Sequence, residues 1–459
     1  MPKEKTLFML FHRYPRTKPC ASPLHGGFLL SGEVELLAVA PTITGPFGKP
    51  GQVDLIGSSA FLERRQEAVQ NAAQSGVPSF EEELWRYTPI GDLDPSKYRL
   101  DAPGGSIADV GLTKGIENEA AAIIEVVDGQ IVSTVVNDEA IQVHSEGIEM
   151  ENAVGSVIPI GTDFFTDCNL SYCTAPLVIE IARNSVVASP ILVRQHTTTS
   201  EIVWFPRLVV QLGENSEATV VEHQASPLIN ALVCPVNEIK VAQAARLKYL
   251  TVQEHGSSLW QISTQVAEVQ RDAHVALSQV ALGGSYARAR IDTQMAGKGS
   301  SGEISAIYFG RENAQHDFRT FQKHEAPHTN SNLLFKGVVD DDSRAIYTGL
   351  IRIESEAGDV NAFQTNRTLK LSESAWAESV PNLEIENNDV KCSHASAVGP
   401  IDEEQKFYLE SRGVPTDIAE ALVVKGFFAD VLEGLPSRPI AQAIDGRIDQ
   451  LVALDKERL

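Results

Sequence analysis

The chain has 459 residues, a formal net charge of −23 and a hydrophobic fraction of 43%. That apolar fraction supports a substantial core and argues against global disorder. The negative charge would repel phosphate groups, which argues against nucleic acid and anionic membranes as partners.

The cysteines are few, odd in number and scattered: Cys20, Cys168, Cys173, Cys234 and Cys392. They contain no CxxC pair and do not resemble a disulfide framework, which suits a reducing compartment. The apolar run Leu7 to Phe11 is too short for a signal-peptide core, and no run approaches about 18 apolar residues. We therefore expect a cytoplasmic protein.

The first residues differ in composition from the rest of the chain. Residues 1–50 carry six Lys and Arg but only three acidic residues, and they contain seven prolines. This composition predicts a poorly ordered extension over residues 1–52.

Residues 53–173 are expected to form a helical and mixed domain. A helical pattern begins after Ser58 or Ser59 and ends at Gly76. From about Ala120 onward, β-branched runs such as "AAIIEVV" indicate strands.

Residues 174–398 have a strand-like and repetitive pattern. The segments "EATVVEHQ", "AARLKYLTVQ", "DAHVALSQV" and "GEISAIYFG" each place a small residue two positions before an apolar one. These small residues (Ala218, Ala245, Ala273 and Gly302) lie 27, 28 and 29 residues apart. Such a period without helical filler favours a β-solenoid, in which stacked coils share one core. The alternative is an antiparallel sandwich whose strands recur at similar spacing.

Residues 399–459 are expected to form a C-terminal helical domain. Asp402 is a candidate N-cap and Gly413 a candidate stop. A second helix carries Phe427, Phe428, Val431 and Leu432, more apolar surface than a small helical lobe hides. These four residues predict either a docking surface for a partner or a cap packed on the solenoid.

The candidate metal ligands are Cys392 and His394. On a strand they would face the same side, and a thiolate with an imidazole suits iron, iron–sulfur species, zinc or copper(I). The alternative is a packed cysteine beside a hydrogen-bonded histidine. A second group, His316, His324 and His328, is a weaker candidate because Pro327 interrupts any helix there.

Two familiar catalytic motifs, GxxxxGK[ST] and GxSxG, are missing from the sequence. The segment "HEAPH" from His324 to His328 matches HExxH, but Pro327 argues against the helix that this motif requires. The sequence therefore predicts no nucleotide-binding loop and no hydrolase nucleophile, and we expect the chain not to be an enzyme.

Several segments together resemble the SufB/SufD family of iron–sulfur cluster assembly proteins. They are "ELWRYTPI", "HTNSNLLFKGVVDDDSRAIYTGLIRI", "NAFQTNRTLKLSESAWAESVPNLEIENNDVKCSHASAVGPIDEEQKFYLESRGV" and "KGFFADVL", within residues 53–435. The resemblance implies a right-handed parallel β-helix flanked by N- and C-terminal helical segments. It also implies a scaffold subunit of the SUF machinery, in which SufB and SufD pair through their β-helices and each binds a SufC ATPase.

Within that family the chain is most similar to SufD. SufB-type chains carry a cysteine in the segment that matches "NAFQTNRTL", where this chain has Gln364, Thr365 and Asn366. They also show a Glu-containing box where this chain has "KCSH". The box departs from the commoner "CSHGAT" at Ala395, Ser396 and Ala397.

The resemblance places His394 and Cys392 at the subunit interface, where iron or a nascent cluster would be held transiently. We expect no cofactor bound stably by the chain alone. It also places ATPase docking on the C-terminal helices. The alternatives are a SufB-like, self-sufficient scaffold and, more remotely, a β-helix polysaccharide enzyme, although the latter is usually secreted.

Overall fold

The computed structural model describes residue 47 and residues 57–100, 104–107 and 110–453. The chain divides into two units, Met1–Leu37 and Ala38–Leu459. The first unit lies outside the described residues, as does the extension predicted over residues 1–52, apart from Phe47. The description that follows concerns the second unit.

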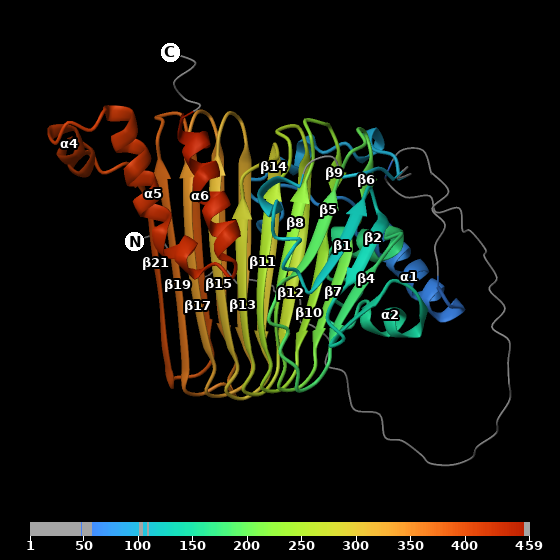
Figure 1. The fold of residues 1–459 in the computed structure, drawn as a ribbon. Helices are drawn as coiled ribbons and strands as arrows, with labels where there is room; N and C mark the ends of the chain where they lie inside the picture. Colours follow the sequence, from blue (N-terminus) through green and yellow to red (C-terminus); the bar gives the residue numbers. More distant parts are fainter. Residues whose placement is uncertain (1–46, 48–56, 101–103, 108–109, 454–459) are drawn as a thin grey trace, which may run out of the picture. The chain divides into compact units, whose positions relative to one another are not determined.

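Two sheets form the core of this unit (Figure 1). The ten-stranded sheet contains, in spatial order, β2 (Gln130–Val136), β1 (Ala122–Val127), β5 (Ile191–His196), β8 (Glu217–Ala225), β11 (Arg246–Glu254), β13 (His274–Ala281), β15 (Ser301–Gly310), β17 (Asn330–Val339), β19 (Val360–Lys370) and β21 (Val390–Pro400). The eleven-stranded sheet contains β20 (Trp376–Ile385), β18 (Arg344–Ile353), β16 (Gln315–His324), β14 (Tyr286–Met295), β12 (Trp260–Val269), β10 (Val236–Val241), β7 (Arg207–Leu212), β4 (Leu177–Ile181) and β3 (Ile141–His144), with β6 (Val203–Trp204) and β9 (Leu232–Val233) beside that path.

From β10 onward, consecutive strands alternate between the two sheets. Within each sheet, neighbouring strands from successive coils pair in parallel, as β17 does with β15 and β19. Antiparallel pairing is confined, among the described strands, to β1 with β2 and β3 with β4. The predicted β-solenoid flanked by helical segments is therefore confirmed, and the antiparallel sandwich is wrong.

The register of the strands corrects the repeat as it was aligned from the sequence. Ala218 pairs with Leu247, Leu247 with Val275, and Val275 with Gly302. The intervals are thus 29, 28 and 27 residues (218 to 247, 247 to 275, 275 to 302), and the equivalent positions lie two residues after Ala245 and Ala273. The same column continues through Ser331 and Ala362 to Cys392.

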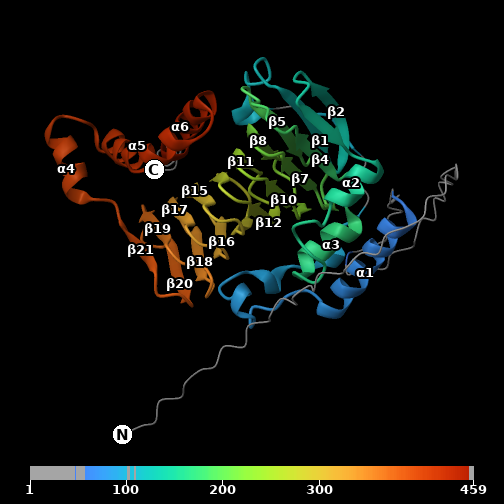
Figure 2. The ribbon, with the colours of Figure 1, turned by 90° about the horizontal axis from the view of Figure 1, so that it is seen from below.

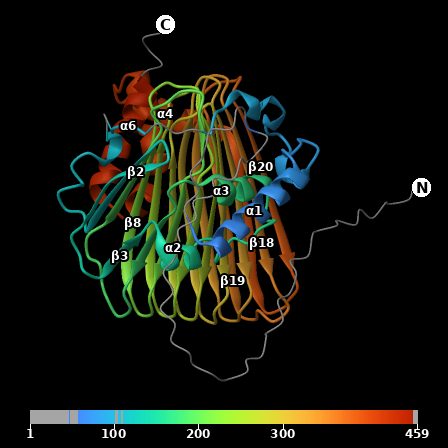
Figure 3. The same ribbon diagram turned by 90° about the vertical axis from the view of Figure 1, so that its right-hand side faces the viewer.

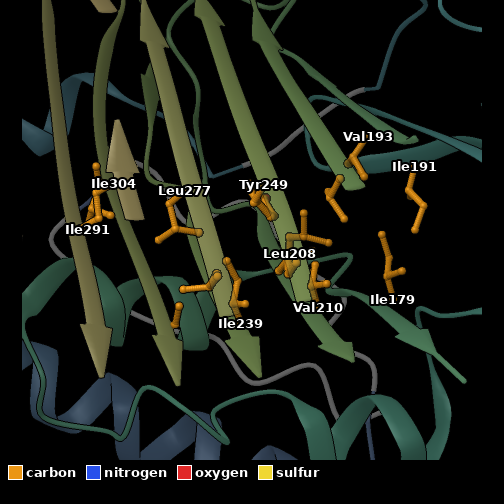
Figure 4. Packing of buried hydrophobic residues seen from close by; sticks show 14 of the residues in the cluster. Ile179, Ile191, Val193, Leu208, Val210, Ile239, Tyr249, Leu277, Ile291 and Ile304 are labelled. Carbon is orange, nitrogen blue, oxygen red and sulfur yellow. The ribbon is translucent and has the colours of Figure 1, made fainter. Parts of the chain in front are cut away.

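The space between the two sheets is filled by inward-facing side chains from every coil. Tyr249 and Leu277 from the ten-stranded sheet and Ile239 and Ile291 from the other are among its fully or almost fully buried members (Figure 4). Burial of one such side chain contributes about 1.5–3 kcal/mol. No coil can bury its inner face alone, so the coils stabilise one another.

The N-terminal helices pack on the outer face of the eleven-stranded sheet (Figure 3). They are α1 (Ser59–Ser75), α2 (Gly147–Ala153) and α3 (Phe164–Tyr172), accompanied by 3-10 turns at Glu83–Trp85, Ile90–Asp92 and Pro95–Lys97. A fourth 3-10 turn, Gly111–Thr113, lies instead on the side of the ten-stranded sheet, where Leu112 packs against the cluster formed with the C-terminal helices. Ser58 caps α1 by accepting a hydrogen bond from the Phe61 N–H, and Gly76 ends the helix at φ +69°. This confirms the helix expected from the sequence.

The first 3-10 turn is attached to the same sheet by a buried ion pair. Arg288 lies 2.6 Å from Asp317, and its guanidinium stacks 3.9 Å from the ring centre of Trp85. A buried charge needs such pairing to offset its lost hydration. The Arg288 guanidinium on which Trp85 stacks is therefore held in position by its ion pair with Asp317.

The C-terminal helices are α4 (Glu403–Ser411), α5 (Thr416–Gly434) and α6 (Arg438–Ala453). Helices α5 and α6 pack on the outer face of the ten-stranded sheet (Figure 2), where Phe428 and Ile444 join a cluster with Ile307 and Val338. Lys336 of β17 pairs with Asp430 at 2.7 Å and fixes α5 in place.

The predicted domain boundaries can be located relative to the helices and strands. The boundary at 173/174 falls between α3 and β4, and the strands β1 to β3 before it already pair with the two sheets. The boundary at 398/399 falls near the end of β21. The division into domains stays a prediction.

One glycine is required by the packing between coils. Tyr308 and Gly337 are register partners, and the Tyr308 ring covers Gly337 and reaches Thr368, the partner of Gly337 on β19. The two hydroxyls lie 2.7 Å apart. A Cβ added at Gly337 would overlap the Tyr308 ring.

We predict that Gly337→Ala lowers the free energy of unfolding by about 1–3 kcal/mol, because the added methyl group overpacks the interior. Gly399→Ala in β21 is the matched control, since a Cβ there meets nothing within 4 Å. Urea and thermal unfolding of both variants would measure the difference. Equal stability of the two variants would contradict the prediction.

Candidate functional site at the C-terminal end of the solenoid

The last coil of the solenoid has unpaired strand edges. β20 and β21 are the terminal strands of their sheets, so each offers one row of backbone donors and acceptors without a neighbouring strand among the described residues (Figure 1). Such edges are natural templates for pairing with another chain. Every residue of β20 and β21 is partly or fully exposed.

Cys392 and His394 lie in this last coil and face the same side of β21. Their register partners on β19 are Ala362 and Gln364, both buried inside the solenoid. Register partners in a parallel sheet point to the same face, so the thiol and the imidazole face inward at the uncovered end. Cys392 is partly buried and His394 is exposed. The shared face expected from their spacing is confirmed.

The thiol of Cys392 is not activated by its surroundings. Burial raises the pKa of Cys392 above its ordinary value. Since the thiolate is the form that binds metal, this surface favours the protonated thiol until a positive charge or a metal approaches. Reactivity at this site therefore depends on what docks onto it.

A small polar network bridges the two last strands beside the pair. Ser379 of β20 accepts a hydrogen bond from the Asn366 amide at 3.1 Å and one from the Ser396 hydroxyl at 2.7 Å. These bonds cross from one sheet to the other and fix the separation of β20 and β21. The strand that carries Cys392 and His394 is thus held even without a following coil.

Exposed apolar side chains accompany the pair at this end of the solenoid. Leu383 and Ile385 of β20, Val398 of β21 and Phe363 of β19 are large hydrophobic residues open to solvent. Leu383 and Ile385 lie near the end of β20 that leads into β21, whereas Val398 lies near the far end of β21, so the exposed apolar groups are spread along this end of the solenoid. Unpaired edges, exposed apolar side chains and two metal-ligand types therefore occur at the same end.

The second histidine group does not form a site. His324 is buried and bonded to the hydroxyls of Thr329 and Ser331, whereas His328 is exposed and pairs with Asp359. Burial lowers the pKa of His316 and of His324 to about 4, so both rings are neutral near pH 7. Over the described ranges, no three His, Cys, Asp or Glu side chains are arranged to hold a metal ion.

The docking surface expected from Phe427, Phe428, Val431 and Leu432 is largely buried against the solenoid. Phe428 and Val431 are buried because they pack against β15 and β17, and Phe427 and Leu432 are partly buried in the same cluster. The prediction of an exposed patch is therefore wrong for Phe428 and Val431. The alternative, packing on the solenoid, describes both of them.

Other side chains expose apolar area in this region. On α4, Phe407 is 70% exposed and Tyr408 57%, and on α5, Ile418 and Leu422 are also exposed. Helix α4 contains no buried residue and is linked to α5 by an ion pair of 3.6 Å between Lys406 and Glu420. The sequence signal for this surface is the aromatic pair in "QKFYLE", which lies among the four charged residues of α4.

In the part of the chain that the structure describes, no helix is both long enough and apolar enough to span a bilayer.

We predict that alkylation of Cys392 keeps accelerating at pH values where an ordinary cysteine has levelled off, because its raised pKa delays formation of the thiolate. An ordinary cysteine peptide levels off near its pKa of about 8.5. Peptide-resolved mass spectrometry after timed iodoacetamide exposure gives both rates. The buried Cys168, Cys173 and Cys234 serve as internal controls that react only on unfolding. A Cys392 rate that levels off below pH 8.5 would contradict the prediction.

Comparison with known proteins agrees with this geometry. Residues 195–427, from the end of β5 into α5, match the family model described as SUF system FeS cluster assembly, SufBD core domain. The chain is 28% identical over 402 residues to the iron–sulfur cluster assembly protein SufD of Escherichia coli, which covers 84% of this chain and 92% of that protein. It is 27% identical over 391 residues to an iron–sulfur cluster assembly SufBD family protein of Mycobacterium leprae (83% and 92%). It is also 27% identical over 282 residues to SufD of Bacillus subtilis (61% and 63%).

The matched span includes all the coils from β7 to β21 and therefore both Cys392 and His394. The chain belongs to the SufBD family of the SUF system for iron–sulfur cluster assembly.

Proposed function

We propose that this chain is a SufD-type scaffold subunit that pairs with a SufB-type subunit and binds a SufC-type ATPase. The observation that carries the proposal is the last coil, where Cys392 and His394 face inward beside the unpaired edges of β20 and β21. A coil built in this way is incomplete until another protein covers it.

The assignment to SufD rather than SufB rests on the residues of β19. Gln364, Thr365 and Asn366 occupy the segment in which SufB-type chains carry a cysteine. Gln364 and Asn366 face the interior and are buried, and neither can receive sulfur. Relatives named SufD in two bacteria support the same choice.

Pairing would occur end to end through the strand edges. Backbone groups of β20 or β21 would bond to a strand of the partner, as in other cases of strand addition. The exposed Leu383, Ile385 and Val398 would then be buried at about 25 cal/mol per Å² of apolar area. His394 and Cys392 would lie inside the interface.

The cluster is cargo in this proposal, and the chain alone neither catalyses a reaction nor retains a cluster. It offers two ligands at most in this coil, whereas a bound iron–sulfur cluster normally needs four. The partner subunit would supply the others. The scattered, free cysteines suit a reducing compartment such as the cytoplasm.

The ATPase would dock on the exposed side of α4 and α5. The surface formed by Phe407, Tyr408, Ile418 and Leu422 is not covered by any described element. Aromatic residues of this type are frequent anchors of protein interfaces. Phe427 and Leu432 would contribute only their exposed edges, since Phe428 and Val431 hold α5 on the sheet.

We predict that His394→Ala lowers the yield of assembled cluster by at least about tenfold while the complex of subunits stays intact. Loss of a residue that merely orients a metal ligand already costs that much. Cluster absorbance and iron content of the co-purified complex would measure the effect. Ser393→Ala, on the same strand but facing outward, is the matched control. Normal iron loading in the His394→Ala complex would remove His394 from the site.

We predict that Phe407→Glu combined with Tyr408→Glu weakens ATPase binding by at least about 30-fold, because each buried aromatic anchor is worth about 2 kcal/mol or more. Binding would be measured by titration calorimetry with the purified ATPase. Leu228→Glu is the control, since Leu228 is also 70% exposed but lies on the loop between β8 and β9. These substitutions leave the covered sheet face intact, which deletion of residues 401–459 would not. Unchanged affinity would place the docking site elsewhere.

A further inference from the structure

The side chain directly beneath His394 has no hydrogen-bond partner in spite of being buried. Gln364 is the register partner of His394, is 2% exposed, and neither its amide oxygen nor its amide nitrogen makes a hydrogen bond. An unsatisfied buried polar group costs about 1–3 kcal/mol. A partner that came within hydrogen-bond reach of this amide would therefore be stabilised by it.

The neighbours of Gln364 limit which group that partner can be. Leu333, its register partner on the other side, is apolar and buried. The Tyr347 hydroxyl already lies 3.1 Å from the Thr320 hydroxyl, and the Asn366 amide nitrogen already donates to Ser379. The Asn366 oxygen is one remaining acceptor. The His394 ring, on the uncovered side, is a further group that can both donate and accept.

The opposite sheet makes room for the glutamine. A Cβ added at Gly349 of β18 would lie 2.7 Å from the Gln364 amide oxygen and would overlap the Tyr347 hydroxyl. The absence of a side chain at position 349 therefore allows the Gln364 amide to occupy this level of the interior. A larger residue would force the amide to move.

We propose that Gln364 is a positioning residue for His394, an inference that rests on the function proposed above. Adjacent strands lie about 4.8 Å apart, which brings the amide and the imidazole within reach of one hydrogen bond once the ring turns inward. The amide oxygen accepts the N–H of one ring nitrogen and so fixes that tautomer. The other nitrogen then carries a lone pair for iron, in the way that second partners orient metal-binding histidines.

The test uses the full-length chain labelled with ¹⁵N-histidine, and the His394 signals are identified by their loss in His394→Asn. In the wild-type chain we expect one tautomer of His394 to predominate. Gln364→Met removes the amide at similar size and should return His394 to the mixture seen in a free imidazole.

Two further variants separate positioning from general destabilisation. Gln322→Met is the matched control: Gln322 is also fully buried with both amide atoms unpartnered, but it lies on β16, away from His394. It should leave the His394 tautomer unchanged. Gly349→Ala displaces the amide but keeps Gln364, so it should change the tautomer ratio of His394 in the same direction as Gln364→Met does. It replaces Gln364→Met in the test if Gln364→Met does not fold.

An unchanged tautomer ratio of His394 in both Gln364→Met and Gly349→Ala would overturn the proposal. These readouts do not involve cluster assembly, so their failure is distinct from that of the proposed function. Normal assembly in His394→Ala would contradict the proposed role of His394 in metal binding. It would not contradict the hydrogen bond proposed between Gln364 and His394 in the wild-type chain. In the complex, Gln364→Met should lower the cluster yield about tenfold or more, as the loss of other such partners does.

Discussion

Parallel stacking of coils in register is the constraint on which the rest of this protein depends. Each strand satisfies its backbone with the coil before and the coil after, and each inward side chain must fit the residues at the same level above and below. A large ring in one coil therefore requires a small residue in the next, as Tyr308 requires Gly337. Because the last coil has no successor, its edges and its inner column are uncovered, and the candidate site occupies that column.

The two ends of the solenoid meet this constraint differently. At the first coils, β2 and β3 run antiparallel to β1 and β4, and α1, α2 and α3 cover the neighbouring outer face. At the last coil, β20 and β21 run parallel to their neighbours and keep the spacing that a further coil would need. The C-terminal helices α5 and α6 cover a side of the solenoid and leave this end uncovered.

Features that depend on neighbours in sequence could be predicted, and those that depend on distant contacts could not. The cap at Ser58, the stop at Gly76 and the shared face of Cys392 and His394 follow from local rules of helix and strand geometry. The repeat was found, but its alignment at Ala245 and Ala273 was wrong by two residues, because one small residue in each coil does not define the register. Burial of Phe428 depends on a sheet whose anchor, Lys336, lies 94 residues before Asp430. The unpartnered amide of Gln364 depends equally on Gly349 and on the absence of a following coil.

The polar bridge from Asn366 through Ser379 to Ser396 has a consequence for local stability. In a stacked array, a coil is stabilised by each neighbour, so a terminal coil receives roughly half of the interface energy of an internal one. Opening of β20 and β21 therefore costs less free energy than opening of any inner coil, and the array would unfold first from this end. The three hydroxyl and amide groups of the bridge add to the ladders with β18 and β19 in opposing that opening before a partner arrives. Binding of a partner would then supply the missing interface and would raise the protection of the backbone amides of the whole coil against hydrogen exchange. Recognition of the partner and completion of the fold would thus be the same event.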